Sequence, residues 1–474
     1  TIREYARIKL DESGETDTVH RWHLAFFTGL AEEAEAKLTS AERPRWFARL
    51  DLEQNNLRTV LEWAIEADPV GALRLATALG TMWEVRLPLF IGGEILGRAV
   101  DRAPDAPPSL RAKALYWVGR MALRQGQLRP AQAELAESLD LYRGLGDRRG
   151  LALTLSDLGS VLMWQGKYSE AETALEESLA IRREFGEAWW IAQTLNNLGM
   201  TRYRCGDYDA ASSNFAECLQ YFRQTGAEMP LAWPLGGLGQ VALGAGDYAA
   251  ARPLLQESAD IWRRHKFAWA LAYRLNDLGL LSWLMKDYAA ARRIHAESLA
   301  ISREIGDERG LAFALEGLAR VTAAEGDSLH AAALVGAAAA RWDTSGATLS
   351  RLEQGVHALL VEQLRGELGE ARLQAALSEG RAMSVEVAGN GLREQPESLA
   401  AFGPKFPRDQ IDRLDTVGAL VNGHHARVAH ILLHAGVADI AMSAEHLHGE
   451  IGDTETSVGT GGLADGQQPF GQSQ

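Results

Sequence analysis

A small-residue motif that returns every 40 residues constrains the fold of this chain more than any other feature. The motif is a Leu-Gly pair, found at Leu158-Gly159, Leu198-Gly199, Leu238-Gly239 and Leu278-Gly279, with Val118-Gly119 before it and Leu318-Ala319 after it in the same frame. A fixed period of this size is the signature of a repeat protein, in which one unit cannot bury its apolar face alone. The sequence therefore predicts a row of stacked units.

Two further features keep the same period. A turn follows each pair at Gly126-Gln127-Leu128, Gly166-Lys167-Tyr168, Gly206-Asp207-Tyr208, Gly246-Asp247-Tyr248, Lys286-Asp287-Tyr288 and Gly326-Asp327-Ser328. An alanine recurs after each turn at Ala131, Ala171, Ala211, Ala251, Ala291 and Ala331. Glycine tolerates a positive φ and aspartate accepts backbone N–H bonds at a helix start, so the turn joins two helices. The recurring small residues allow those helices to approach closely.

This pattern resembles the tetratricopeptide repeat, whose usual period is about 34 residues. We therefore expect an all-α, TPR-like superhelical solenoid of antiparallel helix pairs with longer units. Gly146-Asp147, Gly186-Glu187 and Gly306-Asp307 stand where the return loops belong. Six repeats are expected over 112–345, after a divergent capping helix pair at 72–111 and before terminal capping helices at 346–388.

Composition narrows the possible partners. The formal net charge is −15, and an acidic chain repels phosphate backbones, so we expect no direct nucleic-acid contact. The two cysteines, Cys205 and Cys218, are too few for a disulfide framework or a four-cysteine zinc site. A reducing cytoplasm is the simplest location. No signal peptide or membrane span is expected, and the missing initiator Met suggests either a start inside a longer protein or a trimmed terminus.

The N-terminal flank resembles a known family. Thr1-Ile2-Arg3-Glu4-Tyr5-Ala6 and Asp11-Glu12-Ser13-Gly14-Glu15 look like the end of the winged-helix segment in STAND-type regulatory ATPases, which places a remnant of it at 1–15. The helical connector expected at 16–71 is similar to the family's, through His23 to Glu35, Glu53-Gln54-Asn55-Asn56-Leu57-Arg58 and Leu61-Glu62-Trp63-Ala64. Leu334-Val335-Gly336-Ala337-Ala338 and Leu377-Ser378-Glu379-Gly380-Arg381-Ala382-Met383-Ser384 resemble the usual close of its sensor.

The resemblance covers residues 1 to about 388. In such proteins the connector joins an NB-ARC-like ATPase to a TPR sensor, and many are LuxR-type or AfsR-like bacterial transcription regulators. The resemblance thus implies a C-terminal sensor region without the ATPase and DNA-binding domains, with the absent ATPase of the parent chain as one partner.

Two departures limit what it implies. No Gly-x4-Gly-Lys-Ser/Thr loop occurs, and the nearest string, Gly92 to Ala99, lacks the lysine and the hydroxyl that nucleotide binding requires and lies in an apolar helical stretch. Residues 389–474 do not read as a LuxR-type helix-turn-helix. We therefore expect neither ATP hydrolysis nor DNA contact from this chain.

The tail, 389–474, is atypical and is expected to be partly disordered, since from Gly449 it is rich in Gly, Thr, Gln and Ser. It holds six of the twelve histidines: His424, His425, His430, His434, His446 and His448. His430 and His434 are spaced as metal ligands on one helix face can be, although no cysteine or intervening glutamate completes a known motif. An incidental cluster or a shifted reading frame is the alternative.

The remaining sequence carries no catalytic constellation: no Gly-x-Ser-x-Gly elbow and no His-Glu-x-x-His. We expect a protein that is not an enzyme and has no cofactor and no metal site. Cys218 stands where other repeats have Ser or Ala, which favours a buried small residue over a redox sensor.

In a TPR superhelix the first helix of each pair lines the concave face, so the repeat frame predicts a binding groove. Its candidate residues are Tyr116, Arg120, Leu123, Arg124, Ser156, Ser160, Met163, Trp164, Asn196, Met200, Tyr203, Arg204, Trp233, Gln240, Tyr273, Asn276, Trp283 and Arg320. Amides can bond a peptide backbone, arginines carboxylates, and aromatics apolar side chains. The alternative is that the aromatics pack between repeats and that Arg120, Arg124 and Arg204 lie on a solvated face.

Three functions stay open. The first is a sensor and scaffold that binds a protein, peptide or small-molecule inducer in the groove and restrains the ATPase of the parent protein. The second is a free-standing TPR adaptor for protein–protein contact. The third is an enzyme that uses the His-rich tail with a metal.

Overall fold

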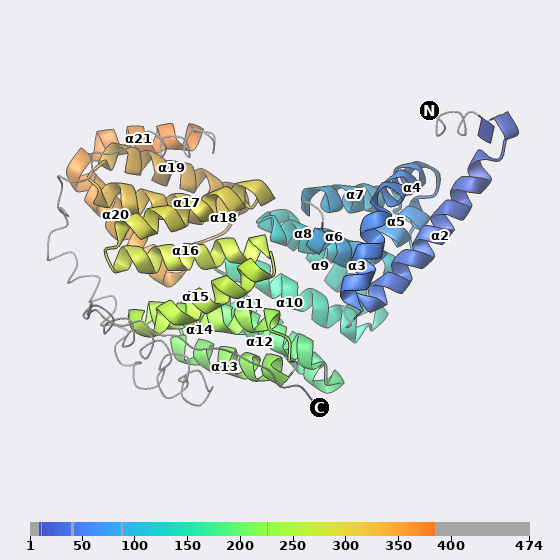
Figure 1. Ribbon diagram of the computed structural model, residues 1–474, viewed down its shortest axis with the longest axis horizontal. Helices are drawn as coiled ribbons and strands as arrows, with labels where there is room; N and C mark the ends of the chain where they lie inside the picture. The colour runs from blue at the N-terminus through green and yellow to red at the C-terminus, as the bar shows by residue number, and fades with distance from the viewer. Residues whose placement is uncertain (1–8, 11, 39–41, 87–88, 225, 384–474) are drawn as a thin grey trace, which may run out of the picture.

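The computed structural model describes residues 9–10, 12–38, 42–86, 89–224 and 226–383 (Figure 1). Every regular element in these ranges is a helix. The all-helical solenoid predicted from the repeat is therefore confirmed. The tail at 389–474, with its six histidines, lies outside the described residues, as does most of 1–15.

Helices α2 to α7 of the described ranges precede the repeats and form a block at the N-terminal end (Figure 1). They are α2 (Thr16–Lys37), α3 (Arg43–Leu52), α4 (Gln54–Ala67), α5 (Pro69–Ala78), α6 (Gly80–Arg86) and α7 (Leu89–Arg102). Residues 72–111, expected to be one capping pair, contain most of α5, all of α6 and α7, and the start of α8. The string from Gly92 to Ala99 lies within α7, where a Cβ on Gly92 would meet Trp83 and Met121, in keeping with helix packing.

Six helical hairpins follow at the 40-residue period. They are α8 (Pro108–Arg124) with α9 (Leu128–Leu145), α10 (Arg148–Trp164) with α11 (Tyr168–Phe185), α12 (Ala188–Cys205) with α13 (Tyr208–Gln224), α14 (Ala232–Gly244) with α15 (Tyr248–Arg264), α16 (Ala268–Leu284) with α17 (Tyr288–Ile305), and α18 (Glu308–Ala324) with α19 (Ser328–Ser345). A short 3-10 turn, η1 (Met229–Leu231), leads into α14.

The turns have the chemistry that the sequence predicts. The residue that ends the first helix of each pair has a positive φ, from 65° at Lys286 to 95° at Gly206. Asp247 then accepts a hydrogen bond from the backbone N–H of Ala250 at 3.0 Å, and Asp207, Asp287 and Asp327 repeat this cap. These four helices thus begin at a residue fixed by local sequence.

The glycine of each Leu-Gly pair receives a side chain from the second helix. A Cβ on Gly159 would lie 2.6 Å from Leu175 Cγ, and one on Gly119 would lie 2.7 Å from Leu135 Cγ. The same offset of 16 residues pairs Gly199 with Phe215, Gly239 with Leu255 and Gly279 with His295. Close approach of the two helices is therefore the role of this glycine, as the repeat pattern predicted.

His295 is the polar exception among these side chains. It is fully buried, and its Nδ1 lies 3.3 Å from Asn276 Oδ1. Burial and the nearby Arg320 lower its pKa to about 3. The folded protein therefore keeps His295 neutral in a pH range where the unfolded chain is protonated.

This difference predicts a pH-dependent effect of His295→Leu. As pH falls from about 6.5 towards 3, His295 binds a proton in the unfolded chain but stays neutral in the folded chain. The native protein therefore loses stability relative to the unfolded chain. Between pH 7.5 and pH 4.5, the free energy of unfolding should fall by about 2 to 3 kcal/mol less in the variant than in the unmutated protein. Urea unfolding at the two pH values measures it, and equal pH slopes in the two proteins would refute the assignment.

In four of the six hairpins, a serine in the second helix forms a hydrogen bond with the first helix. Ser138, Ser178, Ser258 and Ser298 each donate a hydrogen bond to a carbonyl 26 residues earlier, at 2.7 to 2.9 Å. Cys218 occupies the equivalent place in the third hairpin and is fully buried. Burial raises the pKa of the Cys218 thiol well above its usual range, which keeps it unreactive and agrees with a packing role.

The hairpins curve until the first and sixth meet. Arg309, at the start of α18, donates through Nη2 to the carbonyl of Leu123 at the end of α8, at 2.7 Å. The segment 346–350 reaches the second hairpin, because Thr348 N–H donates to the carbonyl of Trp164 at 2.8 Å. Figure 1 shows α8 and α18 facing each other across this closure.

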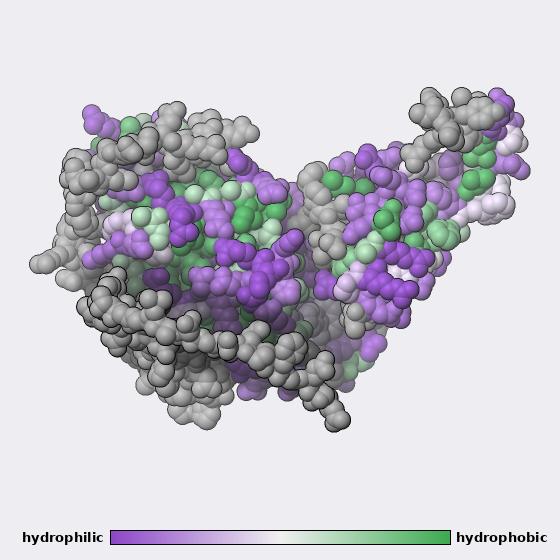
Figure 2. Space-filling view, viewed as in Figure 1, coloured by the Kyte–Doolittle hydropathy of each residue, from purple (hydrophilic) through white to green (hydrophobic). Residues whose placement is uncertain are grey.

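Two helices end the described chain: α20 (Arg351–Leu368) and α21 (Glu370–Ala382). Helix α20 starts with a capping box between Ser350 and Glu353 and buries Val356 in the same core as α14 and α16. Helix α21 packs on α19 (Figure 1). On the face shown in Figure 2, the coloured residues are mainly hydrophilic, and this face is hollowed between the N-terminal block and the C-terminal hairpins. None of the described helices combines the length and apolarity that a membrane crossing needs.

Candidate functional site

One large cavity lies inside the curve of the solenoid. Its empty space, including the part that is open to solvent, amounts to about 1360 Å³. The first helices of all six hairpins contribute to its wall, from Leu123 and Arg124 on α8 to Arg309 and Arg320 on α18. Glu353 of α20 adds a residue from outside the repeats.

Most of the groove residues predicted from the repeat frame line this cavity. They are Leu123, Arg124, Ser160, Met163, Trp164, Asn196, Met200, Tyr203, Arg204, Trp233, Gln240, Tyr273, Asn276 and Arg320. The alternative, in which Arg120, Arg124 and Arg204 lie on a solvated face, does not match their burial. The side chains of Arg120 and Arg204 are 8% and 3% exposed, and that of Arg124 is 18% exposed.

Four predicted groove residues lie behind the wall instead. Tyr116, Arg120, Ser156 and Trp283 are buried and do not line the cavity. Trp283 packs in the core that joins the fourth and fifth hairpins. Ser156 accepts a hydrogen bond from Asn197 Nδ2 at 3.2 Å, so it links two neighbouring first helices. For Tyr116 and Trp283 this placement agrees with the alternative that the aromatics pack between repeats.

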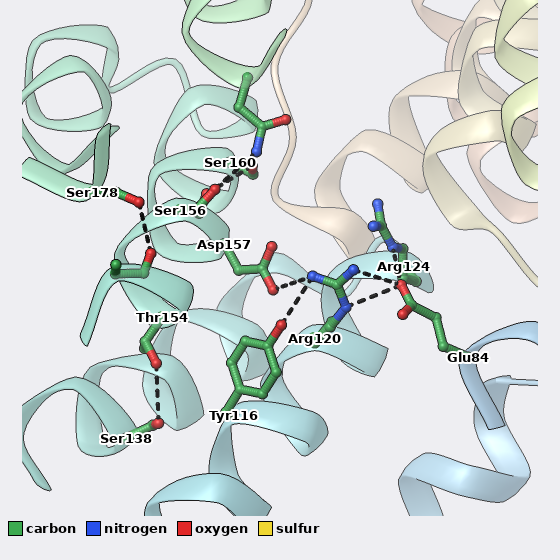
Figure 3. Close-up of polar contacts among 12 residues, drawn as sticks. Glu84, Tyr116, Arg120, Arg124, Ser138, Thr154, Ser156, Asp157, Ser160 and Ser178 are labelled. Carbon is green, nitrogen blue, oxygen red and sulfur yellow. Dashed lines mark hydrogen bonds and ion pairs between the residues drawn. The ribbon is translucent and has the colours of Figure 1, made fainter. Parts of the chain in front are cut away.

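Arg120 forms the centre of a charged network between the N-terminal block and the repeats (Figure 3). Its guanidinium lies 2.7 Å from Asp157 of α10 and 3.0 Å from Glu84 of α6, and it donates to the Tyr116 hydroxyl at 3.1 Å. Arg124 holds the same Glu84 oxygen at 3.0 Å. Burial alone would raise the pKa of Glu84, but the two arginines outweigh it and lower the pKa to about 2. The network thus keeps buried charges paired.

Two arginines stack on one tryptophan in the cavity wall. The guanidinium carbons of Arg204 and Arg309 lie 4.2 and 4.7 Å from the Trp164 ring centre. Tyr273 and Phe313 contact the same ring, at centroid distances of 5.7 and 6.0 Å. We call these five residues the arginine–tryptophan stack. Arg204 also donates to the carbonyl of Thr348, which joins the stack to the closing segment 346–350.

A second polar row comes from successive repeats. Gln240 on α14 donates to Asp277 on α16 at 3.2 Å, at the same repeat positions at which Arg120 holds Asp157. Burial raises the pKa of Asp277 to about 6, against the opposing effects of Arg274 and Gln240. Asn196 and Asn276 stand at equivalent positions two repeats apart and both line the cavity.

The repeat frame could have found some of the residues that the prediction missed. Gln193 and Phe313 share a repeat position with Trp233 and Tyr273, and all four line the cavity. Asp157, Asn197 and Asp277 share another. No repeat signal points to Glu353, because it lies on α20 and enters the cavity only through the closure of the solenoid.

The metal hypothesis rests on residues without a described placement. His430 and His434 lie outside the described ranges. Within those ranges, no three His, Cys, Asp or Glu side chains gather as a metal ion would require.

Profiles of the tetratricopeptide repeat match residues 110–184, 190–264 and 271–305. The first five hairpins are tetratricopeptide repeats. A Rap protein complexed with competence and sporulation factor aligns at 13% identity over 75% of this chain and 99% of its own, with a TM-score of 0.50. The Rap conjugation gene regulator of plasmid pLS20, in complex with a Phr peptide, aligns at 12% identity over 68% and 96%, with a TM-score of 0.50. At such identities the likeness shows a shared TPR solenoid fold.

Sequence relatives come from mycobacteria. A Mycobacterium tuberculosis protein named as an HTH-type transcriptional regulator is 30% identical over 172 residues, and a Mycobacterium bovis protein of the same name matches equally. The match covers 34% of this chain and 19% of the relative, so the chain spans about a fifth of the relatives' length.

Proposed function

We propose that this chain is the sensor region of a STAND-type transcription regulator and binds a ligand or protein partner in its groove. The observation that carries the proposal is that the first helices of six hairpins meet around one cavity. A molecule in that cavity contacts hairpins far apart in the chain. If the molecule binds one curvature of the solenoid more tightly than others, its binding shifts the population towards that curvature.

The contacts that close the solenoid suggest how binding is transmitted. Arg309 reaches Leu123 across 186 residues, and Thr348 reaches Trp164 across 184. Arg309, Leu123 and Trp164 line the cavity, so both contacts involve cavity-lining residues. A ligand that bridges the stack strengthens the closed form, and its loss lets the first and sixth hairpins separate. In the parent protein this change would release or restrain the NB-ARC-like ATPase.

The resemblance at 1–388 and the mycobacterial relatives named as HTH-type transcriptional regulators support this assignment. The Rap regulator bound to a Phr peptide shows that a protein of this fold holds a peptide. A TPR solenoid is typically a non-catalytic scaffold, so we assign no reaction to it.

A thermal-shift screen of the whole chain against metabolites and short peptides tests the proposal. We expect a ligand that raises the melting temperature of the unmutated protein, because binding to the native state alone adds stability. The shift should fall sharply in Asn196→Ala, which removes a buried cavity amide, and persist in Asn55→Ala, which alters an exposed amide on α4. An equal shift in both variants would remove the groove as the site.

A free-standing adaptor is the second candidate, and one observation favours it. Trp22 and Phe26, on α2, are 71% and 61% exposed. Large aromatic side chains at the surface are typical anchors of protein interfaces. A protein partner that is lost with Trp22→Ser and retained with Asn196→Ala would favour the adaptor.

A further inference from the structure

The cavity wall has a chemical bias that narrows the class of ligand. Five arginines line it, Arg124, Arg204, Arg274, Arg309 and Arg320, against three carboxylates, Asp157, Asp277 and Glu353. This excess of two positive charges stands in a chain whose formal net charge is −15. The bias is therefore local to the cavity.

Several buried polar atoms of the wall have no hydrogen-bond partner among the described residues, and most of them are donors. The donors are Nε of Arg204, Nε and Nη1 of Arg309, Nε of Arg320, Nδ2 of Asn276 and Nε1 of Trp269. The acceptors are the side-chain oxygens of Asn196 and Gln240. Buried donors left without acceptors cost free energy. A ligand rich in acceptors removes that cost.

The arginines with such donors are deeply buried. Arg309, Arg204 and Arg320 are 0%, 3% and 5% exposed. The acids behind them do not satisfy these donors, because Asp307 lies 3.8 Å from Arg309 Nε and Glu316 lies 3.9 Å from Arg320 Nη1, beyond hydrogen-bond distance. Glu353 lies as far from Arg204 Nη1, at 3.9 Å. Each guanidinium keeps N–H groups for another acceptor.

The arginine–tryptophan stack also fixes the geometry of the site. A guanidinium that stacks on Trp164 presents its N–H groups at its edge, so Arg204 and Arg309 are oriented before a ligand arrives. Tyr273 and Phe313 add apolar faces beside them. Paired guanidinium edges next to aromatic faces suit an anionic group attached to an apolar frame.

We propose that the cavity takes its ligand through an acceptor-only anionic group, such as a carboxylate, carried on an aromatic or similarly apolar frame. This inference rests on the proposed function, since it names the class of ligand for the same groove. A free organic acid and the C-terminus of a short peptide share this chemistry.

Two fluorescent dyes with one aromatic frame test the inference. Anilinonaphthalene sulfonate carries an anionic group that phenylnaphthylamine lacks. One site per chain should bind the sulfonate at least about tenfold more tightly, as expected for charge-assisted hydrogen bonds of roughly 1.5 kcal/mol or more. Arg309→Gln should remove most of that preference. Arg320→Gln provides a second variant, because Arg309 also holds Leu123 and its loss can unfold the chain.

The control is Arg58→Gln, an exposed arginine on α4 that pairs with Glu62. Its dye preference should match the unmutated protein. Equal affinity for the two dyes, or a preference that survives both cavity variants, would overturn the anionic class. If Asn196→Ala weakens the binding of both dyes equally and the unmutated protein shows no preference for the sulfonate, the groove is a site for neutral ligands and only this inference fails. If no cavity variant changes either dye, the groove itself fails.

Displacement of the bound sulfonate separates the two sources. If indole acetate competes better than indole acetamide and a short peptide has no effect, the ligand is a free acid. A peptide ending in phenylalanine that competes only when its C-terminus is a free carboxylate indicates a peptide end. Amides that compete as well as their acids would refute the proposal.

Discussion

Arg120→Met should destabilise the protein by about 3 to 5 kcal/mol at pH 7, because it leaves two buried carboxylates without their shared cation. Asp157 is 6% exposed and loses a partner at 2.7 Å, while Glu84 keeps only Arg124. Methionine fills much of the arginine stem's volume, so the loss reports charge pairing more than a cavity. Urea unfolding at constant ionic strength measures it.

The lowered pKa of Glu84 determines the direction in which this destabilisation changes with pH. The pKa of Glu84 is lowered to about 2, so its stabilising contribution is present above about pH 4.5 and is lost as pH falls towards 2. In Arg120→Met the Glu84 carboxylate loses one of the two arginines that lower its pKa, so it protonates at a higher pH and the loss of stability should shrink between pH 7 and pH 4. The matched control is Arg58→Met on the exposed pair with Glu62, expected to cost about 0.5 kcal/mol or less. A loss as small as the control's would refute the network.

Gly380→Ala should cost about 2 to 4 kcal/mol, because α21 crosses α19 with no room for a side chain. A Cβ on Gly380 would overlap the backbone carbonyl of Ala333, and one on Gly336 would overlap that of Leu377. Backbone atoms cannot rotate away as a side chain can. The helices must separate, which exposes the buried Leu373 and Ala376. Chemical unfolding should show the loss, and hydrogen exchange should show lower protection at 370–382.

Gly366→Ala is the control for this variant. Gly366 lies in α20, and a Cβ there meets nothing within 4 Å. The same substitution should be neutral or stabilise by up to about 1 kcal/mol, since alanine is the better helix former. Equal effects at Gly366 and Gly380 would show that helix propensity, and not the crossing, determines the outcome.

Local sequence predicted the repeat well because each feature acts between near neighbours. The glycine of Leu158-Gly159 and its partner Leu175 lie 16 residues apart, and Asp247 caps a helix three residues away. The side of each first helix that faces inward also follows from the frame, which is why Trp164, Asn196 and Tyr273 line one cavity. These choices need only helix geometry and one adjoining unit.

Only the tertiary structure decided how far the solenoid curves and what its closure brings together. Small rotations between neighbouring units add up along the row, and no single repeat encodes their sum. That sum places Arg309 on Leu123 and brings Glu353 into the cavity. Arg120 likewise shares its repeat position with Ser160 and Arg320, yet it does not line the cavity, and its guanidinium instead pairs with Glu84 of α6, outside the repeats. The sequence by itself determined the units and their inner faces, whereas long-range packing decided which of those residues line the cavity.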